Sequence, residues 1–194
     1  VLREAVKILA ERGMLETKQG VGTFVAKPDL KNVSKALERF INVNLDCSYK
    51  DLYEIRRILE VGIAKLAAIR ANEEDISLMR KAIDEMKKNR DLDDKWSKAD
   101  LSFHILLAKA THNDLFPTLL SPITNQLLKA YFLTHQVSGS IDSGLQHHRN
   151  ILEKITARDS EGAGKAMLAH LEDSENYIML VEKIRLDYQR GGYI

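Results

Sequence analysis

The chain has 194 residues, with 29 basic and 28 acidic side chains and a formal net charge of +1. This balance excludes a chain-wide basic surface for nucleic acid, so any such site must be local. The single cysteine, Cys47, excludes an internal disulfide and a cysteine-based zinc site, and it indicates a reducing compartment. No apolar run approaches the roughly 20 residues of a membrane span, and we recognise no signal peptide. We therefore expect a cytoplasmic protein with no membrane partner.

The first 27 residues predict a helix followed by a β-hairpin. Residues 1–12 are amphipathic without a preceding cap, as if the sequence began partway through a motif, and Gly13 is a plausible helix stop. Two strand-like runs, at 15–19 and 23–25, flank a turn that contains two glycines. A helix followed by such a wing is the back half of a winged helix-turn-helix, whose helix enters the DNA major groove. The alternative is a helix and hairpin packed onto a larger domain.

From Pro28 onward the spacing of apolar residues predicts helix almost throughout. Pro28 and Asp29 mark a junction, so we expect a linker over 28–32 and a helical domain over 33–190. The predicted helices cover 30–45, about 48–71, 72–88, 93–111, a kinked helix from 113 that contains Pro122, a shorter helix to about 157 and a long one from 159 to about 188. Short loops join them, so the predicted fold class is all-α, an antiparallel helical bundle.

An aspartate and a histidine interrupt the apolar side of the helix predicted over 93–111. At about 100° per residue, Asp100 and His104 share a face with Phe103 and Leu107. A carboxylate and an imidazole in a core-facing stripe are costly to desolvate without a partner. These two residues therefore predict that other polar groups meet them inside the bundle.

Two further histidines have the same inward placement on other helices. His148 shares its face with Leu152, whereas its neighbour His147 lies on the opposite side with Lys154. His170 shares its face with Met167 on the last helix. We therefore expect His148 and His170 to point into the bundle and His147 to point outward.

Asp100, His104, His148 and His170 are the candidate metal ligands. A single inward histidine is usually a satisfied core residue, and Asp-x3-His on a helix is usually a local ion pair. Four converging groups fit those explanations poorly, because each uncompensated buried polar group costs about 1–3 kcal/mol. A divalent cation would satisfy all four. Three imidazoles and a carboxylate suit Zn or Ni, with Mn, Co or Fe as alternatives, and leave positions open for water or a small anion.

Arg56 is the candidate clamp for a carboxylate ligand. It lies on the apolar stripe of its helix, and an inward guanidinium can hold a carboxylate through two hydrogen bonds. The alternative is an ion pair with Glu60, four residues on. Tyr53 and Tyr177 are candidates to line the same cavity, or else core aromatics whose hydroxyls reach a partner.

The combination of motifs is specific. It comprises Leu2-Arg3-Glu4-Ala5-Val6 and Gly20-Val21-Gly22-Thr23-Phe24-Val25, the helix Leu52-Tyr53-Glu54-Ile55-Arg56-Arg57-Ile58-Leu59-Glu60, Asp100-x2-Phe103-His104, His148-Arg149-x-Ile151-Leu152, and Asp159 followed by Ala163, Met167 and His170. In this combination the chain resembles the FadR-type branch of GntR transcription regulators, with its all-helical C-terminal effector (FCD) domain.

The resemblance implies a ligand-responsive transcription factor that binds operator DNA, usually as a repressor and a homodimer. It implies a divalent metal on the Asp and three His named above and a small carboxylate effector near that metal, within reach of Arg56. Arg3 matches a recognition-helix residue, and the wing tip at Gln19-Gly20 approaches the minor groove in relatives. The first two helices of the winged helix do not occur in this sequence, nor do the other basic recognition residues.

Two alternatives use the same four ligands. A metal-dependent enzyme would activate a bound water, but the chain has no His-Glu-x-x-His run and no glutamate beside the ligands in sequence. A purely structural metal would have no open coordination position. The helix and hairpin at the front favour the regulator, so we expect no enzymatic activity.

Overall fold

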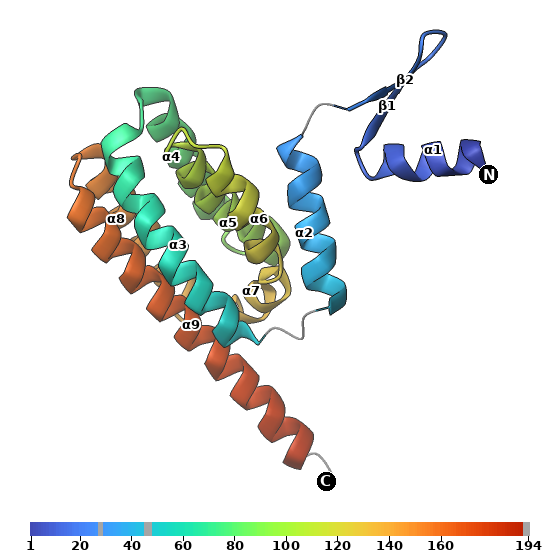
Figure 1. The fold of residues 1–194 in the computed structure, drawn as a ribbon. Coiled ribbons are helices and arrows are strands. Elements are labelled where there is room, and N and C mark those ends of the chain that lie inside the picture. The colour runs from blue at the N-terminus through green and yellow to red at the C-terminus, as the bar shows by residue number, and fades with distance from the viewer. Residues whose placement is uncertain (27–28, 45–47, 192–194) are drawn as a thin grey trace.

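The computed structural model describes residues 1–26, 29–44 and 48–191, so Pro28 and Cys47 lie outside the described residues. Its elements are α1 (Leu2–Glu11), β1 (Leu15–Lys18), β2 (Gly22–Val25), α2 (Leu30–Asn44), α3 (Tyr49–Arg70), α4 (Glu73–Lys88), α5 (Asp93–Lys109), α6 (Leu115–Asn125), α7 (Leu128–Thr134), α8 (Ser140–Thr156) and α9 (Ser160–Gly191). Helices α3 to α9 form a bundle from which the end of α9 projects (Figure 1). The predicted all-α class is confirmed.

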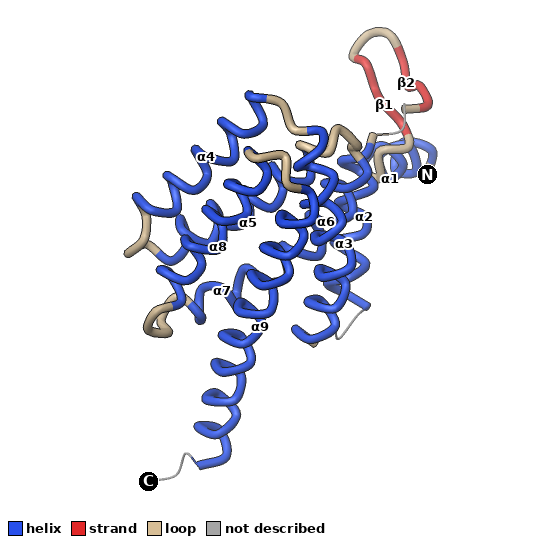
Figure 2. The backbone as a smooth tube through the Cα atoms, turned by 90° about the vertical axis from the view of Figure 1, so that its left-hand side faces the viewer, coloured by secondary structure: helices blue, strands red, loops and turns tan. Residues whose placement is uncertain are grey.

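The N-terminal helix and hairpin form as predicted. Strands β1 and β2 pair antiparallel, with Leu15 opposite Val25 and Lys18 opposite Gly22. Gly13 ends α1 at φ 71° and Gly20 turns the hairpin at φ 75°, both left-handed conformations that glycine adopts without a steric penalty. The hairpin extends away from the bundle (Figure 2). This unit therefore presents its turn at the periphery of the molecule.

Helix α2 begins inside the segment that the sequence assigns to a linker. The backbone N–H of Lys31 donates to the Asp29 carboxylate at 2.9 Å, and that of Asn32 donates to the Asp29 carbonyl at 2.9 Å. Asp29 therefore starts a helix rather than extending a linker, because a side-chain acceptor satisfies a free N–H of the first turn. Residues 30–32 are helical. The division into domains at 1–27 and 33–190 stays a prediction.

Helices α3 and α4 begin where the sequence predicts. Ser48 and Asp51 form a reciprocal capping box at the start of α3, and Asn72 and Asp75 form another at the start of α4. The kinked helix predicted from residue 113 is two helices, α6 and α7. Pro122 lies inside α6, and the backbone then turns before α7 begins. Among the described helices, none is long and apolar enough to cross a bilayer.

The core lies between α3, α5, α8 and α9. Helix α3 packs along α9, and α8 packs against α9 and α4. Fully buried apolar side chains fill this space, among them Ile63, Phe103, Ile151 and Met167. The same interior also holds buried polar side chains from all four helices. Burial of this kind requires that each polar group find a partner.

Candidate metal centre

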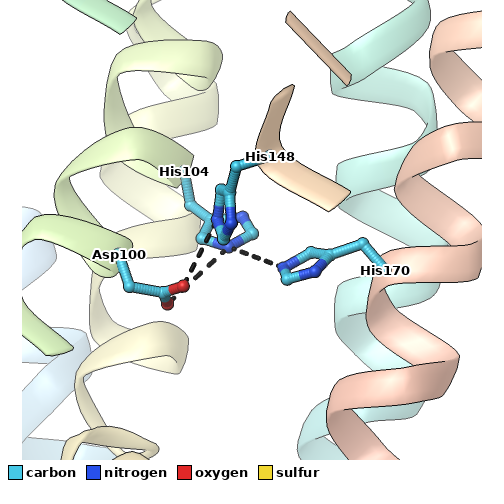
Figure 3. Close-up of side chains that lie close together, drawn as sticks. All are labelled: Asp100, His104, His148 and His170. Carbon is cyan, nitrogen blue, oxygen red and sulfur yellow. Dashed lines mark hydrogen bonds and ion pairs between the residues drawn. The ribbon is translucent and has the colours of Figure 1, made fainter. Parts of the chain in front are cut away.

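The four predicted ligands come together in the middle of the bundle. Asp100 and His104 come from α5, His148 from α8 and His170 from α9, and each is at most 4% exposed. One ligand atom from each lies within 4.8 Å of the other three. Figure 3 shows the carboxylate and three imidazoles pointing toward a common centre, with His170 approaching from the side opposite Asp100. Helices far apart in sequence thus supply one cluster.

The distances between these atoms leave room for one ion. His148 Nε2 lies 3.3 Å from one Asp100 oxygen, and His104 Nε2 lies 3.9 Å from the other. The Nε2 atoms of His104 and His170 lie 3.2 Å apart. Two ligands of a tetrahedral Zn site, each about 2.0–2.2 Å from the ion, lie at comparable separations from each other.

Second hydrogen bonds orient two of the imidazoles. His104 Nδ1 donates to a Glu60 carboxylate oxygen at 2.5 Å, and His148 Nδ1 donates to the Gly144 carbonyl at 2.6 Å. Because both partners only accept, each ring carries a proton on Nδ1 and turns its Nε2 to the centre. His148 Nε2 has no hydrogen-bond partner among the described residues. A metal ion would satisfy this nitrogen, so the donor set fits a cation.

Burial keeps two of the imidazoles neutral. It lowers the pKa of His148 to about 4, although the Asp100 carboxylate opposes the shift. Burial, together with the neighbouring His148 and His104, lowers the pKa of His170 well below its usual value. A histidine binds a metal only in its neutral form. At neutral pH these two ligands are therefore already in the binding state.

Arg56 forms the ion pair that the sequence left open as an alternative. It is fully buried, its Nε donates to Glu60 and its Nη1 donates to the Tyr131 hydroxyl. Its Nη2 lies 3.5 Å from His104 Nε2, beside the cluster. Arg56 is therefore both the partner of Glu60 and a donor that borders the candidate metal centre.

Sequence reasoning missed Glu60 as a member of the site. Burial alone would raise the pKa of its carboxyl, but the Arg56 and His104 partners outweigh it and lower the pKa to about 2. Glu60 lies four residues after an inward arginine, so it shares that inward face, and this spacing could have identified it. One oxygen accepts from Arg56 and the other from His104. A carboxylate with so low a pKa is a weak base, and both of its oxygens already accept hydrogen bonds, so Glu60 is poorly suited as a general base.

The tyrosines divide between the core and a cavity. Tyr53 is fully buried, its hydroxyl lies 2.6 Å from Ser174 Oγ and its ring packs against Arg56. Tyr131, which the sequence did not single out, accepts from Arg56 as described above. Tyr177 lines a cavity of about 30 Å³ whose walls also include Asp100 and His170. Neither Tyr53 nor Arg56 is among the residues that line it.

The remaining predicted residues lie outside the cluster. His147 is outside the cluster, with 23% of its side chain exposed and Nε2 at 3.4 Å from the Asp173 carboxylate. Arg3 is exposed on α1, and Gln19 and Gly20 are exposed at the turn between β1 and β2. The structure thus separates the candidate DNA-contacting residues from the candidate metal ligands.

Comparison with known proteins identifies the family. The FCD domain model matches residues 51–173. The HTH-type transcriptional regulator LutR of Bacillus subtilis (strain 168) is 31% identical over 182 residues, which cover 91% of this chain and 83% of LutR. A putative L-lactate dehydrogenase operon regulatory protein of Escherichia coli (strain K12) is 30% identical, over 88% of this chain and 68% of that protein.

A solved structure agrees with this assignment. The GntR protein of Streptococcus agalactiae has a TM-score of 0.68 and 30% sequence identity, covering 89% of this chain and 78% of that chain. These relatives are transcriptional regulators, so the chain is a regulator and not an enzyme. The chain belongs to the GntR family of transcriptional regulators, in the group that carries an FCD domain.

Proposed function

We propose that the FCD domain of this regulator binds a divalent metal through Asp100, His104, His148 and His170, and a small carboxylate effector beside it. The observation that carries the proposal is the fully buried Nε2 of His148, which has no hydrogen-bond partner among the described residues and faces three other ligand atoms within 4.8 Å. Hydrogen-bonded outer partners such as Glu60 are usual behind metal-bound histidines. The donor set suits Zn or Ni, with Mn, Co or Fe as alternatives.

The charges in the site favour an anionic effector. With neutral imidazoles, the two carboxylates of Asp100 and Glu60 oppose the charges of Arg56 and a divalent ion, which leaves one positive charge inside the bundle. An uncompensated buried charge is costly. A monocarboxylate that ligates the metal would cancel it, and Arg56 Nη2 lies close enough to the centre to donate to that carboxylate.

One relative points to the same class of effector. It is named for an L-lactate dehydrogenase operon, and lactate is a small hydroxycarboxylate. The cavity of about 30 Å³ that adjoins Asp100 and His170 has room for about one or two water molecules, so such a ligand would have to widen it to reach the ion. A purely structural metal would be closed to added ligands, so this cavity favours the sensor over the structural alternative.

Effector binding would act as an allosteric switch on operator DNA. In the assembled regulator, a homodimer, the effector would bias the helices that carry Arg3 and the wing tip at Gln19-Gly20. Only a difference in effector affinity between two conformations can change DNA affinity. Operator binding that the effector weakens would make the protein a repressor.

Metal analysis of the purified chain tests the first half of this proposal. We expect one metal ion per chain in the wild type and in His147→Ala, and loss of the ion in His148→Ala. His147→Ala is the matched control, because it removes an imidazole from the adjacent position on α8 that is not one of the four ligands, although its ring lies 5.6 Å from that of His170. An ion retained by His148→Ala and lost from His147→Ala would contradict the assignment.

Titration of operator DNA tests the second half. The full-length protein, loaded with metal, is titrated against fluorescent operator with and without lactate and related acids. We expect DNA affinity to change with the acid in the wild type and not in Arg56→Met. A DNA affinity that no small carboxylate alters would contradict the effector site while leaving the metal site standing.

A further inference from the structure

The cavity beside the metal cluster has a second carboxylate in its wall. Asp173 lies on α9 one helical turn after His170, and 36% of its side chain is exposed. It accepts a hydrogen bond from Ser143 Oγ at 2.5 Å and lies 3.4 Å from His147 Nε2. Both partners belong to α8. The Asp173 carboxylate is therefore fixed at the junction of α8 and α9 rather than free to swing away from the cavity.

The basic side chains that the structure describes at the cavity are imidazoles: His135 and His170 line it, and His147 lies 3.4 Å from the Asp173 carboxylate. Among the described residues that line the cavity there is neither lysine nor arginine. Arg56 does not line the cavity; its Nε and Nη1 donate to Glu60 and Tyr131, and its Nη2 lies 3.5 Å from His104 Nε2. The metal would supply positive charge at the end of the cavity formed by Asp100 and His170, whereas the Asp173 wall stays negative. A ligand in this cavity would therefore have positive charge near one of its groups, from the metal, and negative charge near another, from Asp173.

The wall also offers a hydrogen-bond donor without a partner. Trp96 is 7% exposed, lines the cavity, and its Nε1–H has no partner among the described residues. A buried N–H of this kind gains most from an acceptor on the ligand. Asp173, which already accepts from Ser143, can accept a further hydrogen bond. A hydroxyl group can serve either one, whereas a second carboxylate can only accept.

We infer that Asp173 sets the specificity of the effector site, so that it accepts small hydroxylated monocarboxylates and rejects dicarboxylates of similar size. The inference rests on the proposed function, because it needs an effector in this cavity. The first carboxylate ligates the metal. A second one would approach Asp173 in a partly desolvated site, where like charges repel more strongly than in water.

The test compares lactate with tartronate, in which a second carboxylate replaces the methyl group. Both are titrated calorimetrically into the Zn-loaded chain, with free Zn²⁺ held constant by a metal buffer so that chelation does not empty the site. We expect lactate to bind the wild type more tightly. Asp173→Asn should shift the ratio of the two dissociation constants about tenfold toward tartronate.

Three variants control this experiment. Glu172→Gln removes the same charge from the next position of α9, which is exposed and does not line the cavity, and it should leave the ratio unchanged. Asp173→Glu keeps the charge and should keep the preference for lactate. Asp173→Ser provides a second neutral side chain if Asp173→Asn fails to fold.

The outcomes separate the two proposals. A wild type that binds neither acid contradicts the proposed effector function itself. A wild type that binds lactate, with a ratio that neither neutral variant shifts, overturns the role of Asp173 and leaves the proposed function standing. A shift of equal size in Glu172→Gln would also overturn it, because the effect would then follow net charge and not the cavity wall.

Discussion

The interior of the bundle and the N-terminal helix with its hairpin hold their functional residues in opposite ways. In the bundle each candidate ligand is buried, and a second hydrogen bond fixes His104 and His148. In α1, all of whose residues the structure describes, no residue is buried. Burial ties the first set of side chains to one geometry, whereas exposure leaves Arg3 free to adapt to a partner. Changes in the bundle should therefore alter metal binding and stability, and changes in α1 should alter DNA affinity alone.

The largest effect should come from removing a ligand. Asp100→Ala deletes the only carboxylate among the four ligands, so the metal should no longer stabilise the folded state. At a metal concentration of 1,000 times the dissociation constant, metal binding should raise the free energy of unfolding by about 4 kcal/mol. Urea unfolding with and without a chelator measures it: the wild type should lose this stability on chelation and the variant should not respond.

A matched control uses an exposed aspartate. Asp142, whose side chain is 72% exposed, pairs with Arg90 at the bundle surface. Asp142→Ala should keep the full response to the chelator. An equal chelator response in Asp100→Ala and the wild type would remove the carboxylate from the proposed ligand set.

Acid should destabilise the metal-free bundle through His148. Its pKa is about 4 in the folded state against 6.5 for an unperturbed histidine, so the unfolded chain takes up the proton first as the pH falls. The stability of the fold with a neutral, buried His148 is therefore fully present above pH 6.5, and it falls as the pH is lowered from 6.5 to 4. The fall amounts to about 3 kcal/mol.

Urea unfolding of the chelated protein across this pH range measures the loss. In His148→Gln, which cannot take up a proton, the slope of stability against pH should be smaller by about one proton. A slope that this variant shares with the wild type would mean that other groups carry the acid sensitivity.

Removing the outer partner of His104 should have a smaller effect. Glu60→Gln keeps the shape of the side chain but replaces the carboxylate that accepts from His104 and Arg56. Loss of such a partner typically weakens metal binding by about 10–100-fold. Competition with a chromophoric chelator gives the affinity.

The control is a second Arg–Glu pair, which joins α3 to α9. Arg57 pairs with Glu175 near the surface, where both side chains are partly exposed. Glu175→Gln should cost no more than about 1 kcal/mol of stability and leave metal affinity unchanged. Equal metal affinities in the two variants would mean that Glu60 does not tune the site.

Helical periodicity was enough to predict that the four ligands point into the bundle, because it fixes which face of a helix each residue occupies. It correctly separated His148 from His147, which are adjacent in sequence. It could not show that Glu60 meets His104, since 44 residues and a helix packing arrangement separate them. Glu60 was instead considered only as the local partner of Arg56. That interpretation was correct but incomplete.

The cavity was beyond sequence reasoning for a related reason. Its wall joins Tyr131, in the middle of the short helix α7, to Asp173 on α9. We predicted one kinked helix over this region and did not predict α7 as a separate helix, because the apolar spacing does not show where the backbone turns after Pro122. The four candidate ligands, which lie on long amphipathic helices, were therefore predicted, whereas Tyr131 on the short helix α7 was not.

The smallest effect on the bundle should come from Arg3→Ala, and it tests the comparison from the other side. Arg3 is exposed on a helix without buried residues, so its loss should change the free energy of unfolding by less than about 0.5 kcal/mol and leave metal content unchanged. In the full-length protein, operator affinity should fall. If Arg3 contacts a phosphate, the slope of log affinity against log salt should also decrease by about one per site.

Lys7→Ala, on the same helix and also exposed, removes the same charge and shows whether position matters. Equal losses from both variants would mean that α1 contributes only general positive charge.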